Sequence, residues 1–220
     1  GNGIFGTDGI LGKVGKVLTP ALAMQVGYWC NHVLTQHGPV LIGQDSRLSG
    51  DMVTAALTAG LSAAGREVWT IGVCPTPAIA HLIKKLGASG GLMVSASHNP
   101  PEDNGIKIFD STGEKINPQK QLLLESILKG ELSDSKVIPI YSGYGKTYQR
   151  YELLKNYRKW LLESVTGKTL EGIKIVLDLC WGSATSCGAE VFEELGAEVI
   201  VLHGKPDGSK INLNCGSTQL

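Results

Sequence analysis

The sequence lacks an excess of charge of either sign. Of its 220 residues, 20 are Lys or Arg and 20 are Asp or Glu, so the formal net charge is zero. Proteins that bind nucleic acid or membrane surfaces generally carry a surplus of basic residues, so this balance argues against both partners. It is still compatible with a local basic pocket. No apolar run approaches the length of a membrane span, and residues 1–6 lack the charged and apolar regions of a signal peptide.

Ordered cysteine patterns are also missing. The five cysteines are scattered, odd in number and without a C-x-x-C pair, which argues against a disulfide framework and a zinc site. We expect them to be small buried side chains in a reducing cytoplasm. The sequence contains no Walker and no H-E-x-x-H motif, so it carries no signature of those nucleotide- and zinc-binding classes.

What the chain does contain is a regular alternation of helix and strand signals. Pairs of a capping residue and a proline, typical of helix starts, lie at residues 19–20, 76–77 and 117–118. Ser49 is a further candidate cap. Short apolar segments typical of buried strands lie at residues 40–43, 67–71 and 90–95. A strand at 106–109 follows too closely for a helical crossover, so we expect it to pair antiparallel in a mixed α/β sheet.

The second half of the chain repeats this pattern after a break. Residues 131–146 have the composition of a linker, and a helix followed by strands at 173–178 and 198–202 is expected beyond them. Two strands rarely sustain a core alone. We therefore predict a mixed-sheet α/β domain at residues 1–140 and, at 147–220, the first, incomplete half of a similar second domain.

The most informative stretch is residues 95–101 (SASHNPP). In this stretch Ser97 comes just after a buried strand and is followed by His98 and Asn99. Two prolines come next and favour a turn of the chain. In α/β proteins ligands bind beyond the carboxyl ends of the strands. Ser97 is therefore either part of a polar turn or the carrier of an acyl or phosphoryl group.

Phosphoryl chemistry fits this stretch better than acyl hydrolysis. It needs positioning, cations and a metal, whereas no Asp or Glu is marked out as a triad partner for Ser97. Asn99 and the turn amides can donate to phosphate oxygens. Lys107 is either an outward residue of an alternating strand or a cation aimed at the phosphate.

Two further clusters are candidates for the same site. Residues 5–12 (FGTDGILG) place Thr7 and Asp8 among glycines, which is typical of a simple turn or of a binding loop. Residues 43–47 (GQDSR) place Asp45 and Arg47 at a strand end, where the alternative is an ordinary surface ion pair. No carboxylate metal site is visible in these clusters.

In this order the motifs resemble the α-D-phosphohexomutase superfamily and, within it, the phosphoglucosamine mutases. Residues 5–10 (FGTDGI) are similar to an N-terminal signature of that group, and residues 95–100 and 103–107 (DNGIK) are similar to the phosphoserine loop and the segment after it. Residues 178–218 resemble the first half of the second domain. The resemblance covers essentially the whole chain.

The resemblance implies a cytoplasmic isomerase that interconverts glucosamine 6-phosphate and glucosamine 1-phosphate on the route to UDP-N-acetylglucosamine. Ser97 would carry the phosphoryl group and pass it to the sugar through a bisphosphate intermediate, with glucosamine or glucose 1,6-bisphosphate as activator. Mg²⁺ would bridge the phosphate of Ser97 and three aspartates of a loop beyond residue 220. The other residues implied in the site are His98 and Lys107 as catalytic groups, and Thr7, Asp8, Asn99 and Arg47 in the substrate and phosphate loops.

The resemblance also implies partners and limits. The substrate would be a hexosamine phosphate, and the full-length enzyme could form a homodimer, without nucleic acid or membrane. Leu11 stands where the superfamily has an active-site arginine, and Gln219 where histidine is common. We expect the 220-residue chain alone not to turn over substrate, because several site-forming loops would lie beyond it. The alternatives are a phosphoglucomutase or phosphomannomutase, and a non-catalytic phosphate-binding domain.

Overall fold

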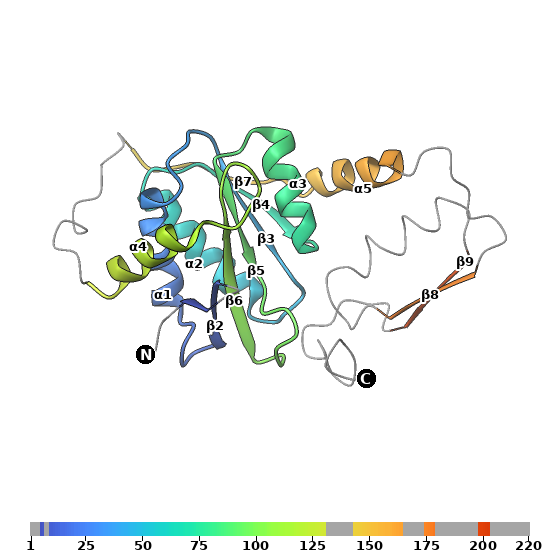
Figure 1. Ribbon diagram of the computed structural model, residues 1–220, viewed down its shortest axis with the longest axis horizontal. Coiled ribbons are helices and arrows are strands. Elements are labelled where there is room, and N and C mark those ends of the chain that lie inside the picture. The colour runs from blue at the N-terminus through green and yellow to red at the C-terminus, as the bar shows by residue number, and fades with distance from the viewer. Residues whose placement is uncertain (1–4, 7–8, 131–142, 165–173, 179–197, 203–220) are drawn as a thin grey trace.

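The computed structural model describes residues 5–6, 9–130, 143–164, 174–178 and 198–202 of the chain (Figure 1). Its main body is a seven-stranded mixed sheet in the order β1-β2-β6-β5-β3-β4-β7. The strands are β1 (Phe5–Gly6), β2 (Gly9–Lys13), β3 (Val40–Gln44), β4 (Val68–Val73), β5 (Gly90–Val94), β6 (Asp103–Phe109) and β7 (Thr147–Gln149). The helices are α1 (Pro20–Trp29), the 3-10 turn Cys30–His32, α2 (Gly50–Ala63), α3 (Thr76–Leu86), α4 (Pro118–Leu128) and α5 (Leu153–Ser164).

Two of the three predicted pairs of capping residue and proline begin helices as expected, whereas in α3 the residue before the helix is Pro75, so Thr76 lies inside the helix and is not its cap. The Thr19 hydroxyl accepts a hydrogen bond from the Leu22 amide at 3.0 Å, and the Asn117 side chain accepts one from the Lys120 amide at 2.8 Å. Each of these caps precedes a proline in the first turn of its helix. Ser49 precedes α2 as expected but makes no cap bond, because its hydroxyl instead accepts from the buried amide of Asn104, 2.9 Å away.

The sheet is covered on both faces, with one apolar core on each side. Helices α1, α2 and α4 pack on one face around Val26, Leu57 and Leu124, while α3 and α5 cover the other around Ile79 and Tyr157 (Figure 1). The fully buried Val94 and Met93 of β5 point to opposite faces and join opposite cores. The mixed α/β fold that the sequence predicted is confirmed.

Strand β6 pairs antiparallel with β5, which confirms the expectation for this strand and places Lys107 opposite Met93. Residues 5–6 and 9–12 lie in paired strands. Strands β1 and β2 form an antiparallel hairpin, and β2 continues the sheet by pairing with β6, so that Ile10 lies opposite Ile106. The hairpin thus brings the N-terminal cluster beside the strand that carries Lys107.

Residues 147–164 pack with the first sheet. Strand β7 pairs in parallel with β4 and forms one edge of the sheet, and Leu153 and Tyr157 of α5 are buried in the core under α3. Further along, β8 (Lys174–Asp178) and β9 (Glu198–Leu202) form a parallel pair, as expected for those segments. The division into units at 1–140 and 147–220 stays a prediction.

Cys30 and Cys74 are buried and are not joined in a disulfide, in agreement with their expected role as small core side chains. Burial raises the pKa of the Cys30 thiol to about 12, and the nearby charge of Arg66 opposes this only in part. The thiol therefore stays protonated and inert. The other three cysteines lie outside the described residues. In the part of the chain that is described, no helix has the length and apolar character needed to cross a bilayer.

Candidate active site at the carboxyl edge of the sheet

The candidate site lies where the parallel strands end. Strands β3 and β5 are parallel neighbours, so the residues that follow them meet at one edge of the sheet. The Asp45 amide donates to the carbonyl of Val94 at 2.9 Å, which ties the loop after β3 to the end of β5. The segment with Asp45 and Arg47 therefore lies directly beside the segment with Ser97, at the carboxyl ends of the strands, where α/β proteins usually bind ligands.

Ser97 and Lys107 are in direct contact. The Lys107 ammonium donates a hydrogen bond to the Ser97 Oγ at 2.7 Å. Ser97 is exposed and Lys107 is half-buried, although its neighbours Ile106 and Ile108 are buried. Lys107 is therefore not an ordinary outward residue of an alternating strand, because its cation faces the hydroxyl that the sequence singled out.

The backbone of Ser97 is held in an unusual conformation. Its φ is 53°, the only positive value at a non-glycine residue in the described part of the chain. For an L-residue this left-handed region costs on the order of 1–2 kcal/mol, so surrounding contacts must enforce it. One of these contacts is the Ser97 amide, which donates to the Ser95 Oγ at 3.1 Å.

Arg47 supplies most of the remaining contacts. Its side chain is buried, with Nε 3.1 Å from the Asp45 carboxylate. Nη2 donates to the carbonyls of Ser97 and Asn99 at 2.9 and 3.0 Å, and Nη1 donates to those of Pro100 and Asp103. A guanidinium has five N–H donors, and these bonds occupy all of them. The surface ion pair considered from the sequence is therefore wrong, since this pair is buried and holds the loop.

The other candidate residues have different positions. Asn99 shapes the loop, because its side-chain amide donates to the Asp103 carboxylate at 3.0 Å and its backbone amide donates to the Ala96 carbonyl at 3.1 Å. His98 is exposed at the tip of the turn. Thr7 and Asp8 lie outside the described residues.

The hairpin that flanks Thr7 and Asp8 approaches the site closely. Gly9 has a φ of 89°, and a Cβ added there would overlap the Ile106 carbonyl oxygen and come within 3.3 Å of the Lys107 Cα. Leu11 lies opposite Gly105, two residues from Lys107 on the same strand, so Leu11 and Lys107 share a face of the sheet. A longer side chain at position 11 would therefore extend along the face that carries the lysine.

Sequence reasoning named Asp45 only as the neighbour of Arg47 in a candidate cluster and gave Ser95 no role, although both lie in the motifs described above. Ser95 is 7% exposed and donates from its hydroxyl to the Asp45 Oδ2 at 2.8 Å. The signal that could have found them is their placement, since each is the first residue after one of two neighbouring parallel strands.

The described residues do not complete a metal site. Among them, no three or more His, Cys, Asp or Glu side chains are grouped so that they could hold an ion. Asp45 is engaged by Arg47 and Ser95, and Asp103 by Asn99. The Mg²⁺ that the resemblance implies would therefore need carboxylates from outside these residues.

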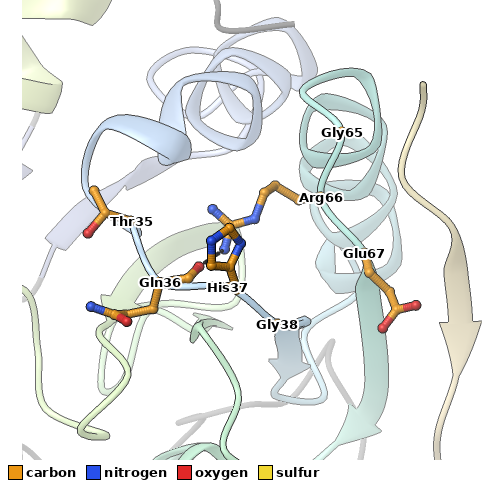
Figure 2. A pocket seen from close by; sticks show the side chains of 7 residues that line it. All are labelled: Thr35, Gln36, His37, Gly38, Gly65, Arg66 and Glu67. Atoms are coloured by element: carbon orange, nitrogen blue, oxygen red, sulfur yellow. Dashed lines mark hydrogen bonds between the residues drawn. The ribbon is translucent and has the colours of Figure 1, made fainter. Parts of the chain in front are cut away.

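A hollow of about 300 Å³ lies at the opposite edge of the sheet (Figure 2). Residues 35–38 and 65–67, which precede β3 and β4, line it. Arg66 extends into this region but donates to chain groups, namely the side chains of Asn31 and Ser89 and the carbonyls of Leu34 and Gln36. These contacts are those of a structural arginine that joins loops at the amino edge.

Comparisons with known proteins identify relatives of this arrangement. Residues 2–134 match the family model described as phosphoglucomutase/phosphomannomutase, alpha/beta/alpha domain I. The phosphoglucosamine mutase of Prochlorococcus marinus (strain MIT 9303) is 65% identical over 216 residues, covering 98% of this chain and 46% of the relative. The phosphoglucosamine mutase of Synechococcus sp. (strain CC9311) is 61% identical, and the match covers 98% of this chain and 47% of that relative.

Solved structures agree on the fold. A phosphoglucomutase/phosphomannomutase family protein from Burkholderia thailandensis is 27% identical with a TM-score of 0.79, covering 94% of this chain and 45% of that one. The phosphoglucomutase parafusin from Paramecium shows the same fold, with 18% identity and a TM-score of 0.67. The match covers 94% of this chain and 44% of parafusin. The chain spans about half the length of the curated relatives it matches. Since the family model covers well over half of its residues, the chain belongs to the phosphoglucomutase/phosphomannomutase family.

Proposed function

We propose that the protein containing this chain is a phosphoglucosamine mutase that interconverts glucosamine 6-phosphate and glucosamine 1-phosphate. The observation that carries the proposal is the contact between the Lys107 ammonium and the Ser97 Oγ, at the edge of the sheet where ligands bind. The choice of glucosamine phosphate among the hexose phosphates is supported by relatives at 58–65% identity that are named phosphoglucosamine mutases.

In the proposed reaction Ser97 carries the phosphoryl group between turnovers. The P–Oγ bond of phosphoserine breaks as a new P–O bond forms to a hydroxyl of the bound sugar phosphate, whose proton leaves to a base. The product is a sugar bisphosphate, and the Ser97 hydroxyl is restored when it takes the proton. In the second half, the Ser97 Oγ attacks the other phosphate of the bisphosphate, the P–O bond between that phosphate and the sugar breaks, and the serine proton passes to the sugar oxygen that is released.

Lys107 acts on the oxygen atom where charge develops. As the P–Oγ bond breaks, negative charge accumulates on the Oγ, and an ammonium at this position, 2.7 Å from the Oγ, stabilises that oxygen more in the transition state than in the ground state, where the ester oxygen carries little of the charge. His98, which is exposed next to Ser97, would contact the incoming sugar phosphate. Thr7 and Asp8 would bind substrate, while Asn99 and Arg47 hold the phosphoserine loop.

The proposed enzyme would also need a metal ion and an activator. Mg²⁺, when bound between the phosphoserine and carboxylates outside the described residues, would neutralise phosphate charge. Glucosamine or glucose 1,6-bisphosphate would activate the enzyme by phosphorylating Ser97. The complete enzyme would act on its hexosamine phosphate in the cytoplasm, and a homodimer is the assembly that the resemblance implies.

The test is an assay of the complete protein that contains this chain. We expect it to convert glucosamine 6-phosphate faster than glucose or mannose 6-phosphate, to carry a phosphate on Ser97 by peptide mass spectrometry, and to lose both properties in Ser97→Ala. A preference for glucose or mannose phosphates would replace the proposal by a phosphoglucomutase or phosphomannomutase. Full turnover by Ser97→Ala would refute the phosphoserine itself.

A further inference from the structure

The Ser95 hydroxyl joins two parts of the candidate site that are far apart in sequence. It donates to the Asp45 Oδ2 at 2.8 Å and accepts from the Ser97 amide at 3.1 Å. Ser95 itself is nearly buried, whereas Ser97 is exposed. This hydroxyl therefore links the interior of the sheet edge to the backbone of the residue that presents the nucleophile.

The Arg47 guanidinium fixes the same loop from its other side. It bonds four carbonyls of residues 97–103, which lie 50 to 56 positions away in sequence, and its ion pair with Asp45 keeps the fork oriented. A planar guanidinium can donate hydrogen bonds to four carbonyls at fixed angles. A lysine ammonium cannot, because it has only three donors and they are all on one nitrogen. Since its donors are in use, Arg47 acts on the loop rather than on a substrate phosphate.

Both contacts converge on the one strained residue. The bond from Arg47 to the Ser97 carbonyl and the bond from the Ser97 amide to Ser95 fix the two peptide groups that flank its φ of 53°. With φ relaxed to the ordinary negative region, the Cα–Cβ bond would turn away from its present direction and the Oγ would leave Lys107.

We propose that Ser95, Asp45 and Arg47 are positioning residues for the transferring serine, and that they hold the Ser97 backbone in the conformation that aims its Oγ at Lys107. This inference rests on the proposed function for its catalytic consequence. A nucleophile displaced by an ångström loses rate rather than substrate affinity, so the residues act on kcat.

The chain offers a matched control at the other end of the same strand. Ser89 precedes β5 as Ser95 follows it, is 1% exposed, accepts from the Arg66 Nη2 at 2.7 Å and donates to the Pro39 carbonyl at 3.0 Å. Ser89 and Arg66 thus form a second buried serine–arginine network, at the edge of the sheet away from Ser97. Deleting either serine hydroxyl removes one donated and one accepted hydrogen bond.

The experiment compares Ser95→Ala with Ser89→Ala, and Arg47→Lys with Arg66→Lys, in the complete protein at a temperature where thermal melts show all four to be folded. We expect Ser95→Ala and Arg47→Lys to lower kcat about 10–100-fold, the range typical of supporting residues behind an active group, with KM nearly unchanged. The two control variants should lose comparable thermal stability and keep the wild-type kcat. An equal loss of kcat in variant and control, or full activity in Arg47→Lys, would overturn the inference.

A second measurement does not depend on activity. The Ser97 amide is hydrogen-bonded to Ser95, so its hydrogen exchange, followed by mass spectrometry or NMR, should accelerate in Ser95→Ala and stay unchanged in Ser89→Ala. Unchanged exchange in Ser95→Ala would refute the positioning role. Failure of the proposed function would look different, because the wild-type protein would then carry no phosphate on Ser97 and show no turnover, while the amide exchange would still differ between the two variants.

Discussion

Replacing Lys107 by methionine tests the central contact of the site. Methionine keeps the length of the side chain and leaves the pairing of β6 with β5 unchanged, so the sheet should be retained. The change removes a positive charge that lies 2.7 Å from the Ser97 Oγ. Its effect should therefore appear in phosphoryl transfer rather than in folding.

The size of the effect follows from Coulomb's law. Two unit charges 2.7 Å apart interact by about 1.5 kcal/mol in the dielectric of water and by about 6 kcal/mol at an effective dielectric constant of 20. Lys107 is half-buried, so its contribution lies between these limits. Single donors aimed at developing oxyanions contribute about 3–4 kcal/mol in enzymes. A loss of about 3 kcal/mol lowers kcat by about 10²-fold, since about 1.4 kcal/mol corresponds to one factor of ten.

The assay is steady-state turnover of glucosamine 6-phosphate by the complete protein, with the extent of Ser97 phosphorylation measured in parallel. Lys107→Arg serves as the control, because it keeps the charge and should retain more kcat than the methionine variant. If Lys107→Met keeps the wild-type kcat while Ser97→Ala has none, then the ammonium does not stabilise the leaving oxygen and the reasoning is refuted.

Three further predictions follow from the described residues. Gly9→Ala should lower the free energy of unfolding by more than about 1 kcal/mol, because φ is 89° and the added methyl overlaps the β6 backbone; a denaturant titration showing no loss would contradict this. Leu11→Arg should lower the KM for sugar phosphate by placing a cation on the face that carries the site lysine, and an unchanged or higher KM would argue against that placement. Burial first, then the charges of Lys85 and Lys84, lower the pKa of His81 below 6.5, so folding favours the neutral ring. The free energy of unfolding should therefore be unaffected by His81 above pH 6.5 and should decrease as pH falls below that value toward the folded pKa. Melting temperatures measured across this pH range should lack the decrease in His81→Gln, and a decrease that persists would exclude His81 as its source.

The local elements could be predicted because their signals are local. The caps at Thr19 and Asn117 bond to amides three residues away, so a short window of sequence contains both partners. Ser49 shows where this fails, because a distant buried amide, that of Asn104, takes the hydroxyl that a local rule assigns to the helix. The placement of β7 and α5 against the first sheet could not be predicted either, since the pairing of β7 with β4 joins segments that are far apart in sequence.

The candidate site divides in the same way. Sequence alone singled out Ser97, because a strand that ends in a hydroxyl-rich turn is a local pattern, and it left Lys107 open between an outward strand residue and a cation aimed at the phosphate. It determined the mixed α/β class and predicted the edge of the sheet at which the candidate site would lie. Only the tertiary structure decided that Arg47 is a buried fork for four carbonyls, that Ser95 holds the Ser97 amide, and that the Lys107 cation meets the Ser97 oxygen. Hydrogen bonds act over about 3 Å and have narrow angular limits, so which donor meets which acceptor is fixed only when the strands are in register.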